Sequence, residues 1–148
     1  MSEQRIISAQ GVVDASASRI FSLIADPARQ PEWDGNDNLS TAESSPRVTA
    51  VGDVFTMVLT NGKVRENHVV EFAENQLIAW KPSGVGQPQP GHLWRWELEK
   101  LDEGRTQVTH TYDWTQLEDE QRMARARSTT ADMLAASIER LRQLAEGA

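Results

Sequence analysis

Alternating segments joined by tight turns fill the middle of the chain, and they constrain its fold more than any other feature. Asn61-Gly62 follows the first segment and is the strongest short signal for a β-hairpin. Glu74-Asn75-Gln76 and Asp102-Glu103-Gly104 mark two further turns. Because tight turns join antiparallel neighbours, the pattern predicts consecutive antiparallel strands. The expected strands span residues 54–60, 63–73, 77–81, 92–101 and 105–114.

A long segment without proline or glycine follows the last of these strands and reaches residue 146. Thr115 and Glu118 form a capping-box pattern at its start, with a hydroxyl side chain followed three residues later by Glu. Apolar residues then recur at intervals of three and four, which gives one apolar stripe. We expect one continuous C-terminal helix, about 45 Å long, that packs this stripe against the sheet. The stripe comprises Met123, Ala126, Thr130, Met133, Leu134, Ser137, Ile138, Leu141 and Leu144.

The N-terminal part of the chain predicts a strand and two short helices. Residues 5–13 alternate as in a strand, and Ser16 is a suitable N-cap for a helix over residues 17–25. Asp26 and Pro27 restart the helix, which ends near Trp33. Residues 39–44 predict an irregular edge strand. The predicted order is therefore a strand, two short helices, about six strands and a long helix. This order predicts an α+β architecture in a single domain, residues 1–148.

Charge and composition exclude several classes of protein. The 148 residues include 15 Lys and Arg, 22 Asp and Glu and no cysteine, so the formal net charge is −7. This acidic balance argues against nucleic acid and anionic membranes as partners. The absence of cysteine excludes disulfides, thiolate catalysis and cysteine-ligated metals. No apolar run approaches the roughly 20 residues of a membrane span, and the start lacks a secretory pattern, so we expect a cytoplasmic protein.

Several stretches carry a resemblance to a known family. One is residues 12–27, VVDASASRIFSLIADP, which join a strand end to a small, polar helix start and the pattern Phe-x-x-Ile-x-Asp-Pro. It is followed by residues 29–34, RQPEWD, and echoed by residues 67–72, NHVVEF, with 77–80, LIAW. In these features the chain resembles the helix-grip superfamily, also called Bet v 1-like or START-like. That superfamily includes the polyketide cyclase/dehydrase and lipid-transport family.

The resemblance covers nearly the whole chain and implies a specific fold. It implies a curved seven-stranded antiparallel sheet that grips the long C-terminal helix, with two short helices between strands 1 and 2. It also implies an internal cavity for an apolar ligand. Some members of the superfamily cyclise or dehydrate polyketides, others carry lipids, sterols or quinones, and others bind chaperones or ribosomes. The fold alone therefore leaves the activity open.

Alternation within each strand predicts which side chains face the cavity. The more apolar face of a strand should point at the helix, and the other face at solvent. On this basis Arg65 and Asn67 are expected to point away from the cavity. The predicted inward residues are Phe55, Met57, Leu59, Val64, Glu66, His68, Val70, Phe72, Trp94, Trp96, Leu98, Val108, His110, Tyr112 and Trp114.

Four polar side chains on the predicted inward faces are candidate catalytic residues, namely Glu66, His68, His110 and Tyr112. Histidine exchanges protons near neutral pH, and burial raises the pKa of a carboxyl group. A tyrosine hydroxyl stabilises a developing enolate oxygen, so the set suits proton abstraction beside a carbonyl. In the alternative interpretation, these groups hydrogen-bond to one another, to the backbone or to water, or β-bulges turn some of them outward.

A metal site is the less favoured interpretation of the same residues. His68, His110 and Glu66 would make a two-histidine, one-carboxylate set. They lie on strands that are not sequence neighbours, and no His-x-His or His-Glu-x-x-His spacing is present. We therefore expect no metal and no other cofactor.

Aromatic and sulfur-containing side chains are the expected lining of the cavity. Trp33 is either a lid over the cavity or a core residue where the short helices meet the sheet. Trp94 and Trp96 share one face and either pack the core or form a flat wall for a planar ligand. The arginines of the last helix are expected to form a solvated face or, alternatively, a docking surface. The expected ligand-binding residues are Trp33, Phe55, Met57, His68, Trp80, Trp94, Trp96, His110, Tyr112, Met123, Thr130 and Leu134.

Three functions fit these features. The leading hypothesis is a cytoplasmic binding module that holds a small, largely apolar ligand, lipid-, polyketide- or quinone-like, between sheet and C-terminal helix. The second is a polyketide cyclase- or dehydratase-like enzyme that uses the four polar residues as acids and bases. The third is a protein-interaction factor with a filled cavity. The expected partner is a small apolar molecule, and the sequence leaves the oligomeric state open.

Overall fold

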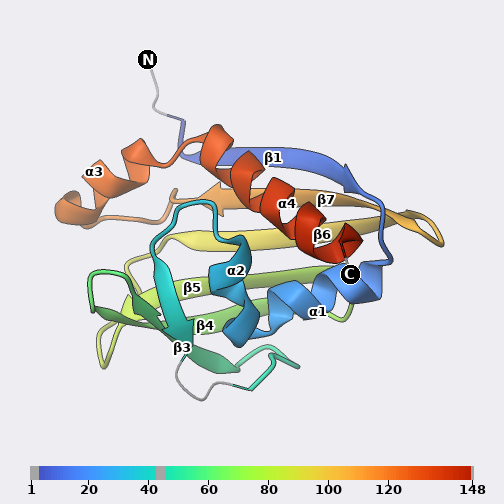
Figure 1. Ribbon diagram of the computed structural model, residues 1–148. Coiled ribbons are helices and arrows are strands. Elements are labelled where there is room, and N and C mark those ends of the chain that lie inside the picture. Colours follow the sequence, from blue (N-terminus) through green and yellow to red (C-terminus); the bar gives the residue numbers. More distant parts are fainter. Residues whose placement is uncertain (1–3, 43–45, 148) are drawn as a thin grey trace.

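A curved antiparallel sheet forms the framework of the fold. The computed structural model of the chain describes residues 4–42 and 46–147. In these residues, seven strands pair in the order β1-β7-β6-β5-β4-β3-β2 (Figure 1). Strands β2 to β7 neighbour one another in chain order, and β1 pairs with β7. The strands are β1 (Ile6–Val13), β2 (Leu39–Ala42), β3 (Val54–Leu59), β4 (Val64–Ala73), β5 (Leu77–Gly84), β6 (Leu93–Asp102) and β7 (Arg105–Asp113).

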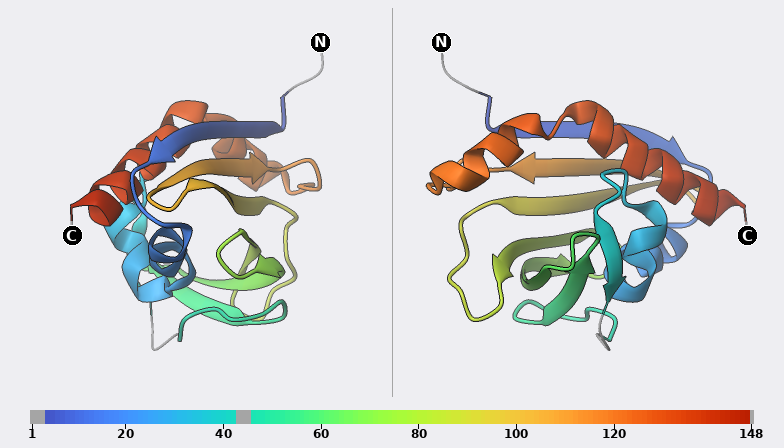
Figure 2. Two further views of the ribbon diagram at one scale, coloured as in Figure 1. Left: turned by 90° about the vertical axis from the view of Figure 1, so that its right-hand side faces the viewer. Right: turned by 60° about the vertical axis from the view of Figure 1, so that its left-hand side comes forward.

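The helices all lie on one face of this sheet, where its curvature makes it concave (Figures 1 and 2). Ser16 caps α1 (Ala17–Ala25) by accepting a hydrogen bond from the backbone N–H of Arg19, as predicted. Asp26 caps the 3-10 turn η1 (Pro27–Arg29), which leads into α2 (Gln30–Trp33). The second short helix thus ends at Trp33, as predicted, and the α+β fold class is confirmed.

The C-terminal helical segment is not continuous, and this corrects the prediction from its apolar stripe. It consists of α3 (Glu120–Ser128) and α4 (Ala131–Glu146). The hydroxyl groups of Ser128 and Thr129 both donate to the carbonyl oxygen of Arg125, at 2.6 and 3.2 Å. These side chains compete with the helical hydrogen bonds, so the helix stops. α4 is the long helix that crosses the sheet, and α3 lies beside its start at a different angle (Figure 1).

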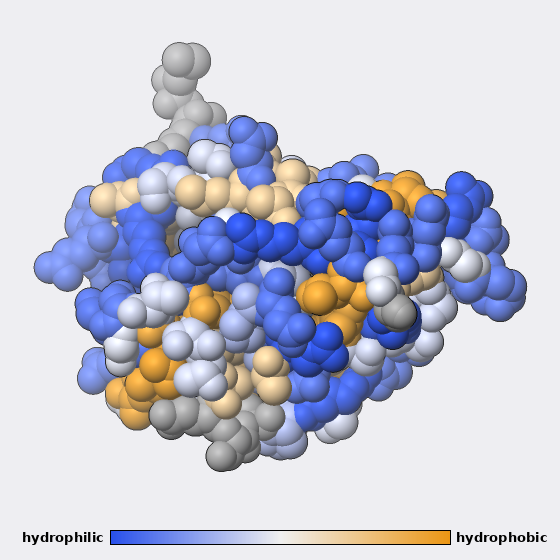
Figure 3. Space-filling model, viewed as in Figure 1, coloured by the Kyte–Doolittle hydropathy of each residue, from blue (hydrophilic) through white to orange (hydrophobic). Residues whose placement is uncertain are grey.

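The caps of these two helices also differ from the prediction. Asp119, rather than Thr115, is the N-cap of α3, and its carboxylate accepts from the N–H of Gln121. Thr130 is the N-cap of α4 and is exposed, so it does not belong to an apolar stripe. Hydrophilic residues cover much of the outward surface over α3 and α4 (Figure 3).

In the first half of β4, the inward and outward faces are exchanged relative to the prediction. Met57 pairs with Arg65, and Phe55 pairs with Asn67. Paired residues share a face of the sheet, so Arg65 and Asn67 join the buried Phe55 and Met57 on the concave side. Val64, Glu66 and His68 are therefore not inward residues, which overturns that part of the expected pattern.

A β-bulge explains why one residue of β4 still points inward as predicted. The pairing of β4 with β5 shifts register between Val69 and Glu71. Such a bulge adds one residue to the strand and reverses the alternation beyond it. Phe72 consequently lies in the core, with its ring 5.6 Å from that of Phe21.

The ends of other strands deviate only slightly from the expected ranges. β5 continues to Gly84, whereas the prediction stopped at residue 81. β2 begins at Leu39 as predicted and runs to Ala42, and the predicted residues 43–44 lie outside the described residues. No helix among the described residues has the length and apolarity needed to cross a membrane.

Two glycines allow α4 to approach its neighbours closely. A Cβ atom at Gly11 on β1 would lie 3.0 Å from Cγ2 of Ile138. A Cβ atom at Gly35, just after α2, would lie 2.6 Å from the backbone nitrogen of Ser137. Since real Cβ atoms essentially never come this close to a backbone atom, Gly35 lets the α2–β2 loop lie directly on α4.

Candidate functional site

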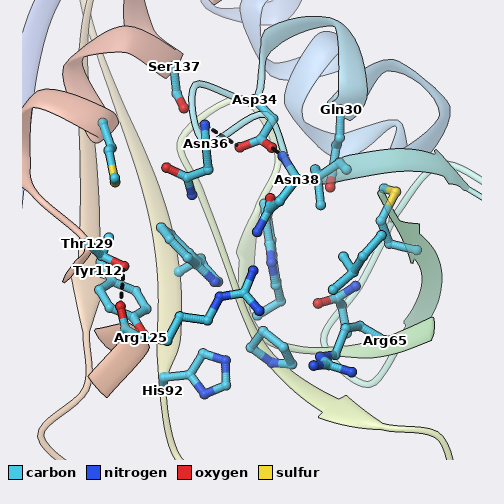
Figure 4. A pocket seen from close by; sticks show the side chains of 18 of the residues that line it. Gln30, Asp34, Asn36, Asn38, Arg65, His92, Tyr112, Arg125, Thr129 and Ser137 are labelled. Carbon is cyan, nitrogen blue, oxygen red and sulfur yellow. Dashed lines mark hydrogen bonds between the residues drawn. The ribbon is translucent and has the colours of Figure 1, made fainter. Parts of the chain in front are cut away.

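A cavity of about 270 Å³ lies between the concave face of the sheet and the helical layer. Its walls come from β3 to β7, and its cover comes from α2, the α2–β2 loop, α3 and α4. Figure 4 shows side chains from these separate parts of the chain pointing into the same space. The tertiary fold thus assembles the cavity from segments that are far apart in the sequence.

Aromatic rings stack along one wall of the cavity. Trp96 and His110 pair across β6 and β7, with ring centroids 3.7 Å apart and planes 12° apart. Trp94 and Tyr112 form the next pair, with centroids 4.2 Å apart. Trp33 packs its edge against Trp96 at 5.1 Å. These contacts make a rigid apolar surface, as expected for aromatic residues that alternate on neighbouring strands.

His110 is held in its neutral form within this wall. Burial lowers its pKa to about 3, although the hydrogen bond to the backbone of Arg95 acts in the opposite direction. The Nδ1 atom lies 3.0 Å from the carbonyl oxygen of Arg95, which can only accept. Nδ1 therefore carries the proton and donates, and Nε2 is left as an acceptor. Burial likewise raises the pKa of Tyr112 to about 12, so its phenol stays protonated.

Polar groups of the α2–β2 loop and α4 line the side of the cavity opposite the sheet. Asp34 accepts hydrogen bonds from the backbone N–H groups of Asn36 and Asn38, both at 3.1 Å. Burial raises the pKa of this carboxyl group, and the two backbone hydrogen bonds partly offset the rise. The N–H of Gly35 donates to Ser137 Oγ at 2.8 Å, which ties the same loop to α4.

Three arginines from two elements meet at the cavity, namely Arg65 on β4 and Arg122 and Arg125 on α3. Burial and then repulsion by the two α3 guanidinium groups lower the pKa of Arg65. Arg125 extends from α3 into the space between His92 and Asn38 (Figure 4). With the Asn38 amide turned so that both its groups are satisfied, its oxygen accepts from Arg125 Nη2 at 2.6 Å. The sequence had suggested that the arginines of the last helix form a solvated face. For Arg122 and Arg125 this is not the whole description, because both also line the cavity.

His92 lies among these arginines and is neutral. Burial lowers its pKa to about 4, and repulsion by Arg122, Arg65 and Arg125 contributes in the same direction. Its Nδ1 atom is buried and has no hydrogen-bond partner among the described residues. Two other lining atoms, Asn36 Oδ1 and Trp96 Nε1, are orphaned in the same way. Buried polar atoms without partners are uncommon in proteins, so three of them around one cavity make it the candidate site.

The structure gathers some of the predicted ligand-binding residues at the cavity and leaves others outside. Phe55 lies behind the wall, with its ring 5.3 Å from that of Trp80, and Met123 and Leu134 belong to a core cluster beneath α3 and α4. Thr130 caps α4, and its neighbour Thr129 lines the cavity instead. The predicted residues that do line the cavity are Trp33, Met57, Trp80, Trp94, Trp96, His110 and Tyr112.

Glu66 and His68 lie on the outer face of the sheet, so the predicted catalytic set of four is not assembled. His68 Nε2 lies 3.0 Å from Ser83 Oγ. Glu66 accepts a hydrogen bond at 3.1 Å from the backbone N–H of Gly86 and thereby holds the β5–β6 loop. His110 is separated from both by the sheet, which also divides the hypothetical two-histidine, one-carboxylate metal set. No group of three or more potential metal ligands occurs within the described parts of the chain.

The sequence interpretation overlooked the polar residues that dominate the site. His92 is the first residue of the predicted strand 92–101 and shares parity with Trp94 and Trp96, so alternation within that strand already pointed to it. Arg65 and Asn67 gave no such signal, because the neighbouring positions on β4 form the more apolar face in the sequence. Arg122 and Arg125 were hidden because the break before α4, which turns α3 toward the cavity, was not foreseen.

Comparison with known proteins identifies the family. The model of a family described as polyketide cyclase/dehydrase and lipid transport matches residues 4–146. The protein Rv0088 of Mycobacterium tuberculosis is 34% identical over 105 residues, which cover 69% of this chain and 44% of that protein. The chain thus matches less than half the length of this relative.

Solved structures at low identity share the fold. The protein MLL2253 from Mesorhizobium loti has a TM-score of 0.71 at 16% identity, covering 97% of this chain and 98% of that one. The Aha1 dimer from Colwellia psychrerythraea has a TM-score of 0.66 at 20% identity, with coverages of 95% and 96%. Identities this low establish the fold alone, whereas the family match spans nearly the whole chain. The chain belongs to the polyketide cyclase/dehydrase and lipid transport family.

Proposed function

We propose that this chain binds one small, largely apolar molecule in the cavity between the sheet and helices α3 and α4. The observation that carries the proposal is the cavity itself, about 270 Å³ in volume with Trp80, Trp94 and Trp96 on its wall. Apolar and aromatic walls with a few convergent polar groups are typical of ligand sites. Ligand pockets usually measure roughly 300–1,000 Å³, so this cavity suits a ligand of one or two rings or one short chain.

The family supports this proposal and indicates the ligand class. Its description joins polyketide cyclisation and dehydration with lipid transport, all of which involve largely apolar molecules. A lipid-, polyketide- or quinone-like ligand of small size is consistent with both the family and the stacked aromatic wall.

The enzymatic alternative has weaker support. Of its four proposed acids and bases, only His110 and Tyr112 line the cavity. With a pKa of about 3 for His110 and about 12 for Tyr112, neither side chain exchanges protons readily near neutral pH. A protein-interaction factor, the third hypothesis, requires a filled interior, so the cavity favours ligand binding over that function as well.

Tryptophan fluorescence tests the proposal, because four tryptophans line the cavity and Trp114 does not. We expect at least one of decanoic acid, 2-naphthoic acid and menadione to change the emission saturably, with one site per chain. The variant Trp94→Phe should lose a large part of this change, because Trp94 lies on the cavity wall. Its matched control Trp114→Phe should retain the change, since Trp114 is buried in a core cluster and does not line the cavity.

Two outcomes would contradict the proposed function. One is the absence of a saturable response to all three compounds. The other is an equal loss of response in Trp94→Phe and Trp114→Phe, which would place the bound compound outside the cavity.

A further inference from the structure

We propose that the ligand is an amphipathic organic anion, whose acidic group binds to Arg65, Arg122 and Arg125 while its apolar body lies on the aromatic wall. This inference rests on the proposed function and names the chemical class that the same cavity selects. It follows from how the arginines are paired across the molecule, from the orphaned polar atoms of the site and from the size of the cavity.

Most arginines elsewhere in the molecule are neutralised by a carboxylate. Arg29 pairs with Glu32, Arg95 with Glu71 at 2.7 Å, and Arg105 with Asp102 at 2.8 Å. Arg47, Arg140 and Arg142 also have carboxylate partners. The chain has more acidic than basic residues, so partners for arginine are plentiful.

The cavity arginines differ from this pattern. Within the described residues, neither Arg65 nor Arg125 forms an ion pair, and Arg122 reaches only Asp119, at 3.3 Å. The one acidic side chain among the described lining residues is Asp34. Its oxygens are already engaged by the backbone N–H groups of its own loop. Two guanidinium groups, with a third nearby, are therefore held together without a counter-charge of the protein's own.

Electrostatic repulsion between the guanidinium groups destabilises the site without a ligand, and an anionic ligand would offset this repulsion. Burial first, and then repulsion by the neighbouring arginines, lowers the pKa of Arg65 and that of His92 beside them. Guanidinium groups bind carboxylates and phosphates through paired, charge-assisted hydrogen bonds. An anion placed among the three arginines would thus replace mutual repulsion by attraction.

A second observation points to the same place. His92 Nδ1 is buried, lacks a partner among the described residues and lies on the arginine side of the cavity (Figure 4). Because its imidazole is neutral, one ring nitrogen carries a hydrogen and can donate to a ligand oxygen. Trp96 Nε1 is a further orphaned donor on the cavity wall. Trp96 Nε1 donates, and His92 Nδ1 donates in the tautomer that carries its hydrogen there, so these atoms and the cations favour a ligand with acceptor oxygens, while Asn36 Oδ1 is left to accept from a ligand donor.

The volume of the cavity and the shape of its aromatic wall limit the size of the apolar part of the ligand. A volume of about 270 Å³ is too small for a lipid with two acyl chains. Beyond the arginines, the stacked pairs of Trp94 with Tyr112 and Trp96 with His110 offer a flat surface. The ligand class is thus a free acid with one or two rings or a single short chain, rather than a lipid embedded in a bilayer.

Isothermal titration calorimetry with two matched pairs of compounds tests this inference. The pairs are 2-naphthoic acid with 2-naphthamide and decanoic acid with decanamide, in which the members differ mainly in charge. For at least one pair, we expect the acid to bind the wild-type protein about tenfold more tightly than the amide, because hydrogen bonds to charged groups are the stronger ones.

Variants locate the source of that preference. In the double variant Arg65→Gln/Arg125→Gln, the preference for the acid should fall to about twofold or less, with little change in amide affinity. The matched control Arg29→Gln/Arg105→Gln makes the same chemical change at two exposed ion pairs and should keep the preference. Circular dichroism melting curves identify any variant that fails to fold.

The possible outcomes distinguish a failure of this inference from a failure of the proposed function. Equal affinity of acid and amide in the wild-type protein, in both pairs, would overturn the inference and leave the proposed function intact. A preference that persists in folded Arg65→Gln/Arg125→Gln would also overturn it. Failure of all four compounds to bind would contradict the proposed function and the inference together.

Discussion

His110 illustrates how burial decides the charge of a single side chain in this molecule. It is 3% exposed, stacks on Trp96 and donates from Nδ1 to a backbone carbonyl. A free histidine has a pKa near 6.5, whereas here burial lowers the pKa to about 3. The folded protein therefore keeps this ring neutral at pH values where the unfolded chain protonates it.

A pH-dependent stability follows from this difference. Between pH 6.5 and about 3, the unfolded chain binds a proton that folded His110 does not, so acidification favours unfolding. The stabilisation is complete above pH 6.5 and is lost progressively as the pH falls through this window. In the wild-type protein, the free energy of unfolding should fall between pH 7 and pH 5.5. In His110→Gln we expect this fall to be smaller by about 1 kcal/mol.

Urea unfolding at the two pH values measures this effect. His92→Gln should reduce the pH dependence in the same direction, because burial also lowers the pKa of His92, to about 4. The comparison uses the pH dependence of each variant rather than its absolute stability, so lost packing does not obscure it. An unchanged pH dependence in both variants would contradict the assignment of neutral rings.

At the scale of the elements, the break between α3 and α4 positions the site. One continuous helix would follow a single direction over the sheet. Instead, Ser128 and Thr129 end α3 by hydrogen-bonding to the carbonyl oxygen of Arg125. α3 thereby lies at its own angle to the sheet and brings Arg122 and Arg125 to the cavity (Figure 1). The contact of α4 with the α2–β2 loop, through Gly35 and Ser137, holds the other side of the cover.

Substitution of Gly35 tests how closely these elements must approach. A Cβ atom there would lie 2.6 Å from Ser137 N and 2.7 Å from Met133 O, both backbone atoms that cannot move away easily. We expect Gly35→Ala to lower the free energy of unfolding by about 1–3 kcal/mol, as is typical of overpacking.

Gly104→Ala is the matched control, because a Cβ atom at Gly104 would meet nothing within 4 Å. It should change the free energy of unfolding by no more than about 0.5 kcal/mol. Urea denaturation of the three proteins gives both values. Equal stabilities of Gly35→Ala and Gly104→Ala would mean that the loop and α4 are not in close contact.

At the scale of the whole molecule, the charge of the side chains at the cavity has the opposite sign to the net charge of the chain. The chain has a formal net charge of −7, yet three arginines converge on its cavity. The long-range field of an acidic protein repels an anion, whereas the local field at the cavity attracts it. Salt screens both, so the dependence of affinity on salt reports which field governs binding.

We expect local attraction to dominate. Raising the ionic strength from about 0.01 M to about 0.15 M shortens the Debye length from about 30 Å to about 8 Å. The affinity for 2-naphthoic acid should then fall by about two- to fivefold. The affinity for 2-naphthamide, which carries no charge, should stay constant. Calorimetric titration at both salt concentrations measures these values, and an acid that binds more tightly at high salt would indicate that the net charge governs binding instead.

Much of the fold could be predicted from local signals. The turns at Asn61-Gly62 and Asp102-Glu103-Gly104, the Ser16 cap and the Asp26-Pro27 restart depend on neighbouring residues, and the structure has a chain reversal or helix boundary at each. The inward faces of β3, β6 and β7 followed from strict alternation, which places Trp96 and His110 on one face. These features were predictable because the interactions that produce them span only a few residues.

The candidate site was less predictable because long-range contacts create it. The pairing of β4 with β3 and β5 decides that Arg65 and Asn67 face the cavity, and the bulge at Val69–Glu71 then reverses the pattern. A sequence shows which residues alternate on β4, but hydrogen bonding with neighbouring strands chooses the face and the register.

The sequence by itself determined the order of the strands and of the N-terminal helices, the family and the aromatic character of the cavity wall, but not the break between α3 and α4. Only the tertiary structure decided the chemistry of the site. It placed Glu66 and His68 outside, turned α3 inward, and gathered arginines from β4 and α3 around His92. The physical reason is that secondary structure depends on local propensity and periodicity, whereas charges from distant segments interact only after packing has brought them together.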